Sequence, residues 1–255
     1  MFIAIIQARM GSTRLPNKVM ERILDKPLIE YLLERVSQSK YIDKIILATT
    51  TNSEDDLLSD FVTGIGYDVF RGSEDDVLSR YYNSYLSVGN PKDKIKGIIR
   101  ITGDCPLFEY EICDKLISKY IDDNLDFANL DKTFAEGLDC AVFSKELLCE
   151  AYNQTNLLSE REHITQYFHK NKDKFNVGSL VNDTDDSKYR ITVDEYKDLE
   201  VIKNIVTYFD KSGENMNINN IKEENFFNQF LVNSVPIPIF YKDTKGCYTG
   251  VNSAF

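Results

Sequence analysis

The sequence has few residues of the kinds that mark zinc-binding, disulfide-bonded or membrane proteins. Only two histidines occur in 255 residues, and the five cysteines form no Cys-x-x-Cys pair. An odd number of cysteines without paired spacing argues against a zinc ribbon or a disulfide framework and fits a reducing compartment. No apolar run is long enough to span a membrane, and the short N-terminal apolar stretch lacks a signal-peptide cleavage sequence. These absences predict a soluble, cytoplasmic protein.

Positive charge is in deficit, since 30 Lys and Arg residues stand against 41 Asp and Glu residues and give a formal net charge of −11. An acidic chain of this kind argues against a general nucleic-acid or anionic-membrane surface. Any local cluster of arginine and lysine is then informative, because the rest of the chain repels a polyanion. The apolar content of 42% over this length is sufficient for one sizeable α/β domain with a small appended segment.

The first hundred residues alternate short apolar runs with amphipathic segments. Strands are predicted over 2–6, 44–51 and 67–70, with helices over 28–36 and from 53 onward. A strand–helix–strand–helix–strand order predicts a parallel sheet with right-handed crossovers. The same patterns predict further strands over 97–102, 140–143 and 189–193, helices over 109–120 and 159–168 and after 194, a polar loop over 211–222, and a helix over 223–232.

A basic loop follows the first predicted strand. It carries Arg9, Arg14 and Lys18 within one short span, and Gly11 allows a ligand to approach the backbone closely. Free N–H groups beside guanidinium and ammonium groups provide the charge-assisted hydrogen bonds that a triphosphate needs. The spacing matches neither the P-loop nor the dinucleotide fingerprint, so an ordinary basic loop stays open as an alternative.

Two aspartates come directly after predicted strands. Asp104 follows the run that ends in Gly103, and Asp194 follows the strand over 189–193. Ligands bind outside the carboxyl ends of the strands in an open parallel sheet, so both positions suit chemistry. An aspartate at such a place also serves as a turn or helix-cap residue, and both alternatives stay open here.

Two capping boxes are predicted, from Ser73 to Asp76 and from Ser159 to Glu162. Each would open a helix, and the N–H groups at a helix N-terminus are free to contact an anion. His163, just after the second box, is read from its own pattern as a structural or exposed histidine.

The basic loop resembles the A-R-x-x-S-T-R-L-P-x-K segment of the cytidylyltransferases that activate sugars as CMP or CDP derivatives. The resemblance is stronger to the family named for spore coat polysaccharide biosynthesis protein F. Its motif groups include R-G-S-x-x-D-V-L-x-R-Y, G-D-x-P-L, E-R-E-H-[IV]-T and R-x-T-V-D-x-x-x-D-L-E, and they occur in the expected order over about residues 1–205. The resemblance to this family implies an α/β fold with a mostly parallel, Rossmann-like nucleotidyltransferase sheet of the GT-A-like type.

The resemblance also implies roles for individual residues. Arg14, Lys18 and Asp104 would be catalytic, and Mg²⁺ would be bound by Asp104 and Asp194. An acidic or phosphorylated sugar-like acceptor would contact Asp139, Arg161 and His163. CTP would contact Ala8, Arg9, Gly11, Ser12, Arg14, Lys18, Thr49, Ser73, Arg80 and Gly103.

The expected reaction is attack of the acceptor on the α-phosphorus of CTP, with release of pyrophosphate for polysaccharide or glycan biosynthesis. A glycosyltransferase that uses a nucleotide sugar stays open as an alternative, as does a non-catalytic nucleotide-binding sensor module. The family pattern has other residues where Glu195 and Tyr196 stand, which leaves the shape of that loop open. A homodimer is also left open by the resemblance.

The last twenty residues, 236–255, resemble the opening of a PAS sensor domain, P-I-P-I-F-Y-K-D-x-x-G-x-Y-x-x-x-N-x-A-F. They predict a strand, a turn and a second strand. We therefore expect a nucleotide-binding domain over 1–222, followed over 223–255 by a helix and the beginning of a truncated PAS-like domain. The chain is expected to be cut from, or derived from, a longer protein that carries a PAS domain.

Overall fold

The computed structural model describes residues 1–89, 94–223, 240–242 and 248–251. The chain divides into two compact units, Met1–Glu195 and Tyr196–Phe255. The predicted domain boundary between residues 222 and 223 falls inside the second unit, and that division stays a prediction.

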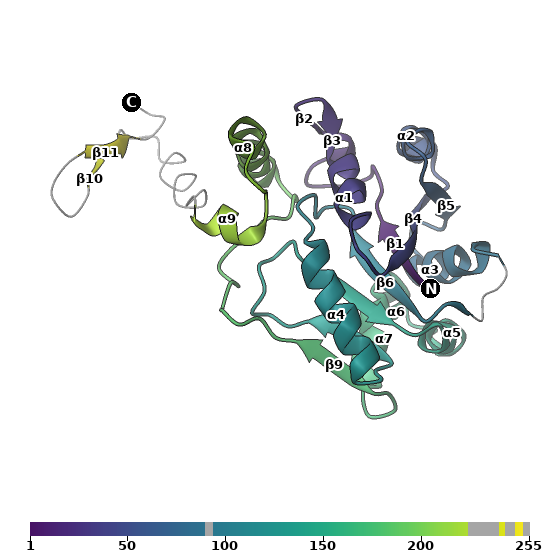
Figure 1. Ribbon diagram of the computed structural model, residues 1–255. Coiled ribbons are helices and arrows are strands. Elements are labelled where there is room, and N and C mark those ends of the chain that lie inside the picture. Colours follow the sequence, from purple (N-terminus) through teal and green to yellow (C-terminus); the bar gives the residue numbers. More distant parts are fainter. Residues whose placement is uncertain (90–93, 224–239, 243–247, 252–255) are drawn as a thin grey trace. The chain divides into compact units, whose positions relative to one another are not determined.

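The first unit is built on a mostly parallel sheet (Figure 1). Its strands lie in the order β5 (Asp68–Gly72), β4 (Ile42–Thr50), β1 (Phe2–Gln7), β6 (Gly97–Thr102), β8 (Cys140–Phe143), β7 (Phe127–Leu130) and β9 (Val177–Leu180). The first four in this order are parallel neighbours, β8 is antiparallel to β6 and β7, and β9 is parallel to β7. The α/β class with a mostly parallel sheet is therefore confirmed.

Helices and two short strands connect the strands of this sheet. The two short strands pair with each other in antiparallel fashion beyond the basic loop. In chain order these connecting elements are η1 (Lys18–Met20), β2 (Arg22–Ile23), β3 (Lys26–Pro27), α1 (Leu28–Val36), η2 (Ser53–Asp55), α2 (Asp56–Gly64), α3 (Val77–Ser87), α4 (Tyr110–Asp122), α5 (Lys145–Gln154), α6 (Leu158–Glu162) and α7 (Ile164–Lys170).

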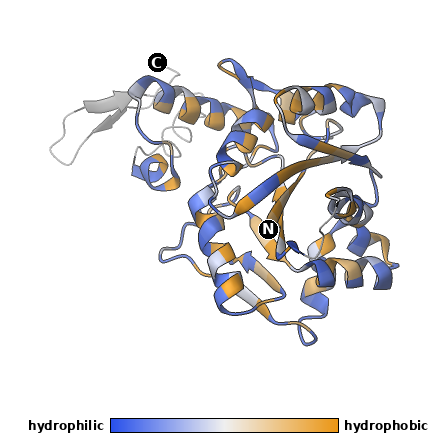
Figure 2. Ribbon diagram, turned by 45° about the vertical axis from the view of Figure 1, so that its right-hand side comes forward, coloured by the Kyte–Doolittle hydropathy of each residue, from blue (hydrophilic) through white to orange (hydrophobic). Residues whose placement is uncertain are grey.

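Strand β1 lies between β4 and β6 and is buried along almost its whole length. Its side chains alternate between the two faces of the sheet. Ile3 and Ile5 belong to one apolar cluster with residues of α3, α5 and α7, whereas the ring of Phe2 meets Tyr120 of α4 edge-on. Figure 2 shows hydrophobic residues along the central strands and mixed hydrophilic and hydrophobic residues on the helices. Burial on both faces explains the continuous apolar run of β1.

Several local predictions for the first unit are wrong. Residues 189–193 form no strand; Arg190 makes only an isolated parallel bridge with Glu136. Helix α3 is capped by Asp76, which accepts the Ser79 N–H. The predicted cap, Ser73, instead accepts the Asp76 N–H in the turn before the helix. The predicted helix over 159–168 is two helices, since the backbone of His163 leaves the helical region at φ −116° and ψ 80°.

The second unit contains α8 (Tyr196–Ser212), α9 (Ile218–Glu223) and an antiparallel hairpin of β10 (Phe240–Lys242) with β11 (Tyr248–Val251). The polar loop predicted over 211–222 is therefore limited to residues 213–217. The strand–turn–strand prediction for the tail is confirmed for its two strands, while the PAS resemblance stays a prediction. The helix predicted over 223–232 lies outside the described residues except for Glu223.

Gly137 lets two backbone segments of the first unit meet. Its φ is +104°, and a Cβ at this position would lie 2.5 Å from the Thr192 nitrogen. The neighbouring Glu136 carbonyl accepts the N–H of Ile191 at 2.7 Å. The segment around residue 136 is thereby fixed against residues 189–192, which lead to Asp194.

We expect Gly137→Ala to lower the free energy of unfolding by about 2–4 kcal/mol, because it adds a strained φ to a backbone clash. Urea denaturation measures the change. Gly64→Ala is the matched control, since no atom lies within 4 Å of its added Cβ. Equal stability of the two variants would contradict the role given to Gly137.

Candidate active site

A cavity of about 410 Å³ opens at the carboxyl ends of β1 and β6. Gln7 and Thr102, the last residues of these parallel strands, form part of its lining. The basic loop from Ala8 to Lys18 forms a further part of the lining. The sequence-predicted residues that line it are Ala8, Arg9, Gly11, Ser12, Arg14, Lys18, Arg80, Gly103, Asp104, His163 and Asp194.

Gly103 brings the two strand ends of this cavity close together. Its N–H donates to the Gln7 carbonyl at 2.8 Å. A Cβ on Gly103 would lie 2.5 Å from the Cβ of Ala8, so no larger residue fits without a shift. Glycine is required here for close approach of the backbones.

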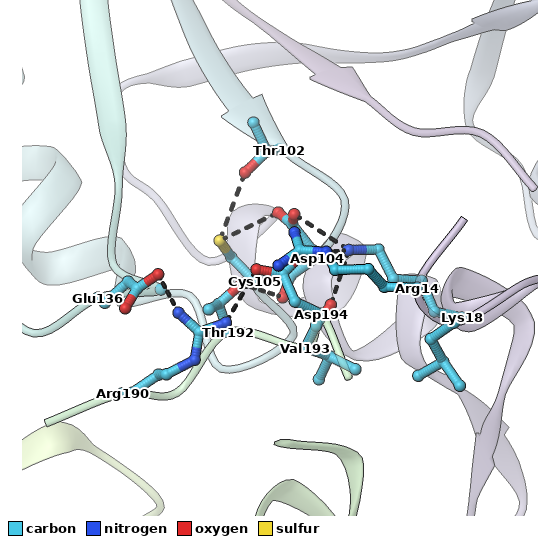
Figure 3. Close-up of polar contacts among 12 residues, drawn as sticks. Arg14, Lys18, Thr102, Asp104, Cys105, Glu136, Arg190, Thr192, Val193 and Asp194 are labelled. Carbon is cyan, nitrogen blue, oxygen red and sulfur yellow. Dashed lines mark hydrogen bonds and ion pairs between the residues drawn. The ribbon is translucent and has the colours of Figure 1, made fainter. Parts of the chain in front are cut away.

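The two predicted metal-binding carboxylates meet on one ammonium group (Figure 3). Lys18 Nζ lies 3.3 Å from Asp104 Oδ2 and 2.9 Å from Asp194 Oδ1, and it donates to the Val193 carbonyl at 2.7 Å. The Lys18 side chain is only 12% exposed, so these contacts are shielded from much of the solvent. Residues that are 86 and 176 positions apart in the sequence are thereby joined.

Asp194 is surrounded by positive charge. Arg14 lies 2.9 Å from its Oδ1, and Arg190 lies 2.8 Å from its Oδ2. Partial burial by itself raises the pKa of Asp194, but the hydrogen bonds from Lys18 and Arg190 and the charge of Arg14 outweigh it. The net effect lowers the pKa of Asp194 below its ordinary value.

The backbone around Asp104 is tied directly to the segment that ends in Asp194. The Asp104 carbonyl accepts the Val193 N–H at 2.8 Å and the Thr192 hydroxyl at 3.1 Å. Arg190, on the same segment, also pairs with Glu136. The position of both carboxylates is therefore set by main-chain hydrogen bonds as well as by charge.

Arg80 brings a buried guanidinium group to the cavity. The residue is 1% exposed and donates from Nη1 to the Ser73 carbonyl at 2.8 Å, while its Nε has no hydrogen-bond partner among the described residues. Burial lowers the pKa of Arg80, although the group stays charged. An unpaired buried donor is costly, and no contact in the described part of the chain offsets this cost at Arg80 Nε. Arg9 is exposed and pairs with Glu74.

Four predicted site residues do not line the cavity. Thr49 is fully buried in β4, and Ser73 accepts the Asp76 N–H at 3.1 Å. Asp139 is exposed and accepts the N–H of Gly137 at 3.1 Å. Arg161 donates to Asp76 at 2.7 Å and to the Thr155 carbonyl at 2.8 Å. The structure gives these side chains local contacts, and their predicted ligand contacts stay predictions.

Residues 3–236 match the family model described as Cytidylyltransferase. The chain belongs to the cytidylyltransferase family. It is 33% identical to spore coat polysaccharide biosynthesis protein SpsF of Bacillus subtilis over 217 residues, which cover 82% of this chain and 87% of the relative. The predicted family resemblance is thus confirmed, and the protein is a cytidylyltransferase enzyme.

Solved structures agree with this assignment. A cytidylyltransferase from Leptospira borgpetersenii superposes with a TM-score of 0.82 at 33% identity, covering 92% of this chain and 98% of that one. CMP:2-keto-3-deoxy-manno-octonic acid synthetase, complexed with CTP, shares the fold with a TM-score of 0.62 at 15% identity, covering 81% and 98%. In the described part of this cytidylyltransferase, no helix is both long and apolar enough to cross a bilayer.

The donor set of this cytidylyltransferase fits a hard divalent cation. Asp104 and Asp194 present carboxylate oxygens to the same ammonium group, and Mg²⁺ is typically bound by one or two carboxylates together with substrate phosphates. Across the described ranges, no group of three or more His, Cys, Asp or Glu residues could hold a metal ion. Asp104 and Asp194 therefore suit a metal site whose remaining ligands are phosphate oxygens of the nucleotide.

Sequence reasoning missed several residues of the cytidylyltransferase site. Gln7 and Thr102 could have been found, because each ends a predicted parallel strand at the edge where ligands bind. Arg190 is the first residue of the R-x-T-V-D motif and could also have been found, whereas Glu136 carried no such signal, since its pairing with Arg190 depends on how distant segments pack.

We expect Lys18→Met to lower the free energy of unfolding in metal-free buffer by about 1–3 kcal/mol, because two carboxylates and one carbonyl lose a common donor. Denaturation in urea measures this change. Lys26→Met serves as the control, since Lys26 pairs with Glu34 at the surface and we expect a loss below about 0.5 kcal/mol. Indistinguishable losses would show that the Lys18 contacts do not stabilise the fold.

Proposed function

We propose that this cytidylyltransferase transfers the cytidylyl group of CTP to an oxygen atom of a sugar or sugar-like acceptor and releases pyrophosphate. The observation that carries the proposal is the convergence of Asp104 and Asp194 on Lys18, beside a basic loop and inside one cavity. Polysaccharide biosynthesis appears in the name of SpsF, and a keto-deoxy sugar acid appears in the name of the CTP-bound relative. Both support an acceptor of the sugar class.

The basic loop supplies the charge for the triphosphate. Arg14 and Lys18 line the cavity, and the N–H groups of Gly11 and Ser12 belong to the same loop. Guanidinium and ammonium groups bind phosphate oxygens through charge-assisted hydrogen bonds and neutralise the leaving pyrophosphate. The protein's contribution is then mainly positioning and charge neutralisation.

Asp104 and Asp194 would hold Mg²⁺, with Lys18 moving from the carboxylates to the phosphates when the nucleotide binds. When bound, the cation supplies charge stabilisation and lowers the pKa of the acceptor hydroxyl. Arg190 donates a hydrogen bond to Asp194 and would thereby hold this carboxylate toward the cavity. His163 lies at the cavity and suits an acidic or phosphorylated group on the acceptor.

We expect Asp104→Asn to reduce pyrophosphate release from CTP at least about 1,000-fold, because it removes a carboxylate from the reacting centre. The assay compares four nucleoside triphosphates against a panel of acidic sugars and phosphate esters, with Mg²⁺ present. Glu111→Gln, on the exposed side of α4, is the control and should retain full turnover.

Retained turnover in Asp104→Asn would remove this carboxylate from the mechanism. Sugar transfer from a nucleotide sugar without pyrophosphate release would favour a glycosyltransferase. CTP binding without turnover on any acceptor would favour a nucleotide-binding module.

Mutation can separate the roles of the two predicted acceptor residues, Arg161 in α6 and His163 directly after it. We expect His163→Gln to raise the acceptor KM about 5- to 20-fold, because His163 lines the cavity. Arg161→Gln should leave that KM within about twofold and lower stability instead, because it breaks the contact with Asp76. Steady-state kinetics and thermal unfolding of both variants measure the difference. A KM effect confined to Arg161→Gln would reverse the assignment.

A further inference from the structure

Two internal hydrogen bonds of the basic loop converge on the Met10 carbonyl. The Met10 carbonyl accepts the N–H of Ser12 at 2.8 Å and the N–H of Asn17 at 3.0 Å. Asn17 has a left-handed backbone with φ 61°, which turns the chain back toward Met10. The loop that carries Arg14 between these two bonds is therefore closed on Met10, which is itself buried.

Met10 is in turn held by a buried carboxylate from another part of the chain. Its N–H donates to Asp55 Oδ1 at 2.6 Å. Asp55 Oδ2 accepts the N–H of Thr50 at 3.2 Å and also the Thr50 hydroxyl. Asp55 is 0% exposed, and burial of a carboxylate is costly unless strong hydrogen bonds compensate it. One side chain thus joins the basic loop to the end of β4.

The segment that carries Asp55 is itself braced. Arg71 donates to the Thr50 carbonyl and to the Asn52 carbonyl, both at 2.8 Å, and pairs with Asp56. These contacts fix the backbone before Asp55 and add an ion pair to the residue after it. Asp55 is therefore a rigid point of attachment for the loop. It does not line the cavity.

We propose that Asp55 is a positioning residue for nucleotide binding, which fixes the backbone of Met10 so that Arg14, Lys18 and the loop amides face the cavity. Asp55 touches no nucleotide and acts only through Met10. The inference rests on the proposed function, because the ligand of the loop is taken to be CTP.

The first test uses the unaltered protein without nucleotide. Hydrogen exchange at the Met10 amide reports whether the bond to Asp55 persists in solution. We expect protection of Met10 comparable to that of the β1 amides. Exchange as fast as in an exposed loop would overturn the proposal, and this readout does not depend on catalysis or on CTP.

The second test is Asp55→Asn, which keeps the shape but replaces one acceptor oxygen by an NH₂ group. We expect Met10 exchange to accelerate at least about tenfold and the Kd of Mg·CTP, measured by titration calorimetry, to rise about 10- to 100-fold. The acceptor KM should stay within about threefold, because the acceptor is not bound by the loop.

Thr50→Val is the control, since it removes a hydroxyl that donates to the same carboxylate and accepts the Asn52 N–H, and it leaves both partners of the Met10–Asp55 contact in place. It should lower the melting temperature but keep the Kd of Mg·CTP within about threefold. An Asp55→Asn protein that is folded and binds CTP normally would overturn the proposal. The proposal would also be overturned if Asp55→Asn and Thr50→Val were equally stable and weakened the binding of Mg·CTP equally. Absence of CTP binding in the unaltered protein would instead count against the proposed function.

Discussion

The ammonium group of Lys18 is the contact on which the site of this cytidylyltransferase depends. Two carboxylates of like charge would repel each other at the carboxyl edge of the sheet. Lys18 bridges Asp104 and Asp194 and also donates to the Val193 carbonyl. The fold can therefore assemble an acidic pair before any cation is bound. The same group is well placed to contact phosphate when a nucleotide arrives.

Main-chain contacts make this arrangement rigid. The Asp104 carbonyl accepts hydrogen bonds from Val193 and Thr192, and Gly137 allows a neighbouring segment to pack against residues 191 and 192. Across the cavity, the basic loop is closed on Met10, which bonds to Asp55. Backbone segments fixed in this way need little reorganisation during reaction, and such preorganisation is a main source of electrostatic catalysis.

Sequence reasoning succeeded where local pattern determines structure. The strand at the N-terminus, the helix from Leu28 and the strand before Asp104 all have the expected bounds to within a residue or two. It failed at residues 189–193, whose apolar side chains suggested a strand, because the neighbouring backbone contributes only a single bridge from Glu136. It also missed the break at His163, which no proline or glycine marks.

The sequence by itself determined the alternation of strands and helices and the residue types at the strand ends, since both follow from side-chain periodicity and short-range backbone preference. It also identified the basic loop from its charge and both aspartates from their positions after strands, and the family resemblance implied their roles with nucleotide and metal. Only the tertiary structure decided that Lys18 bridges the carboxylates, that Arg190 supports Asp194 and that Asp55 holds Met10. These contacts join residues from 4 to 176 positions apart, and the long-range ones depend on packing that local sequence does not encode.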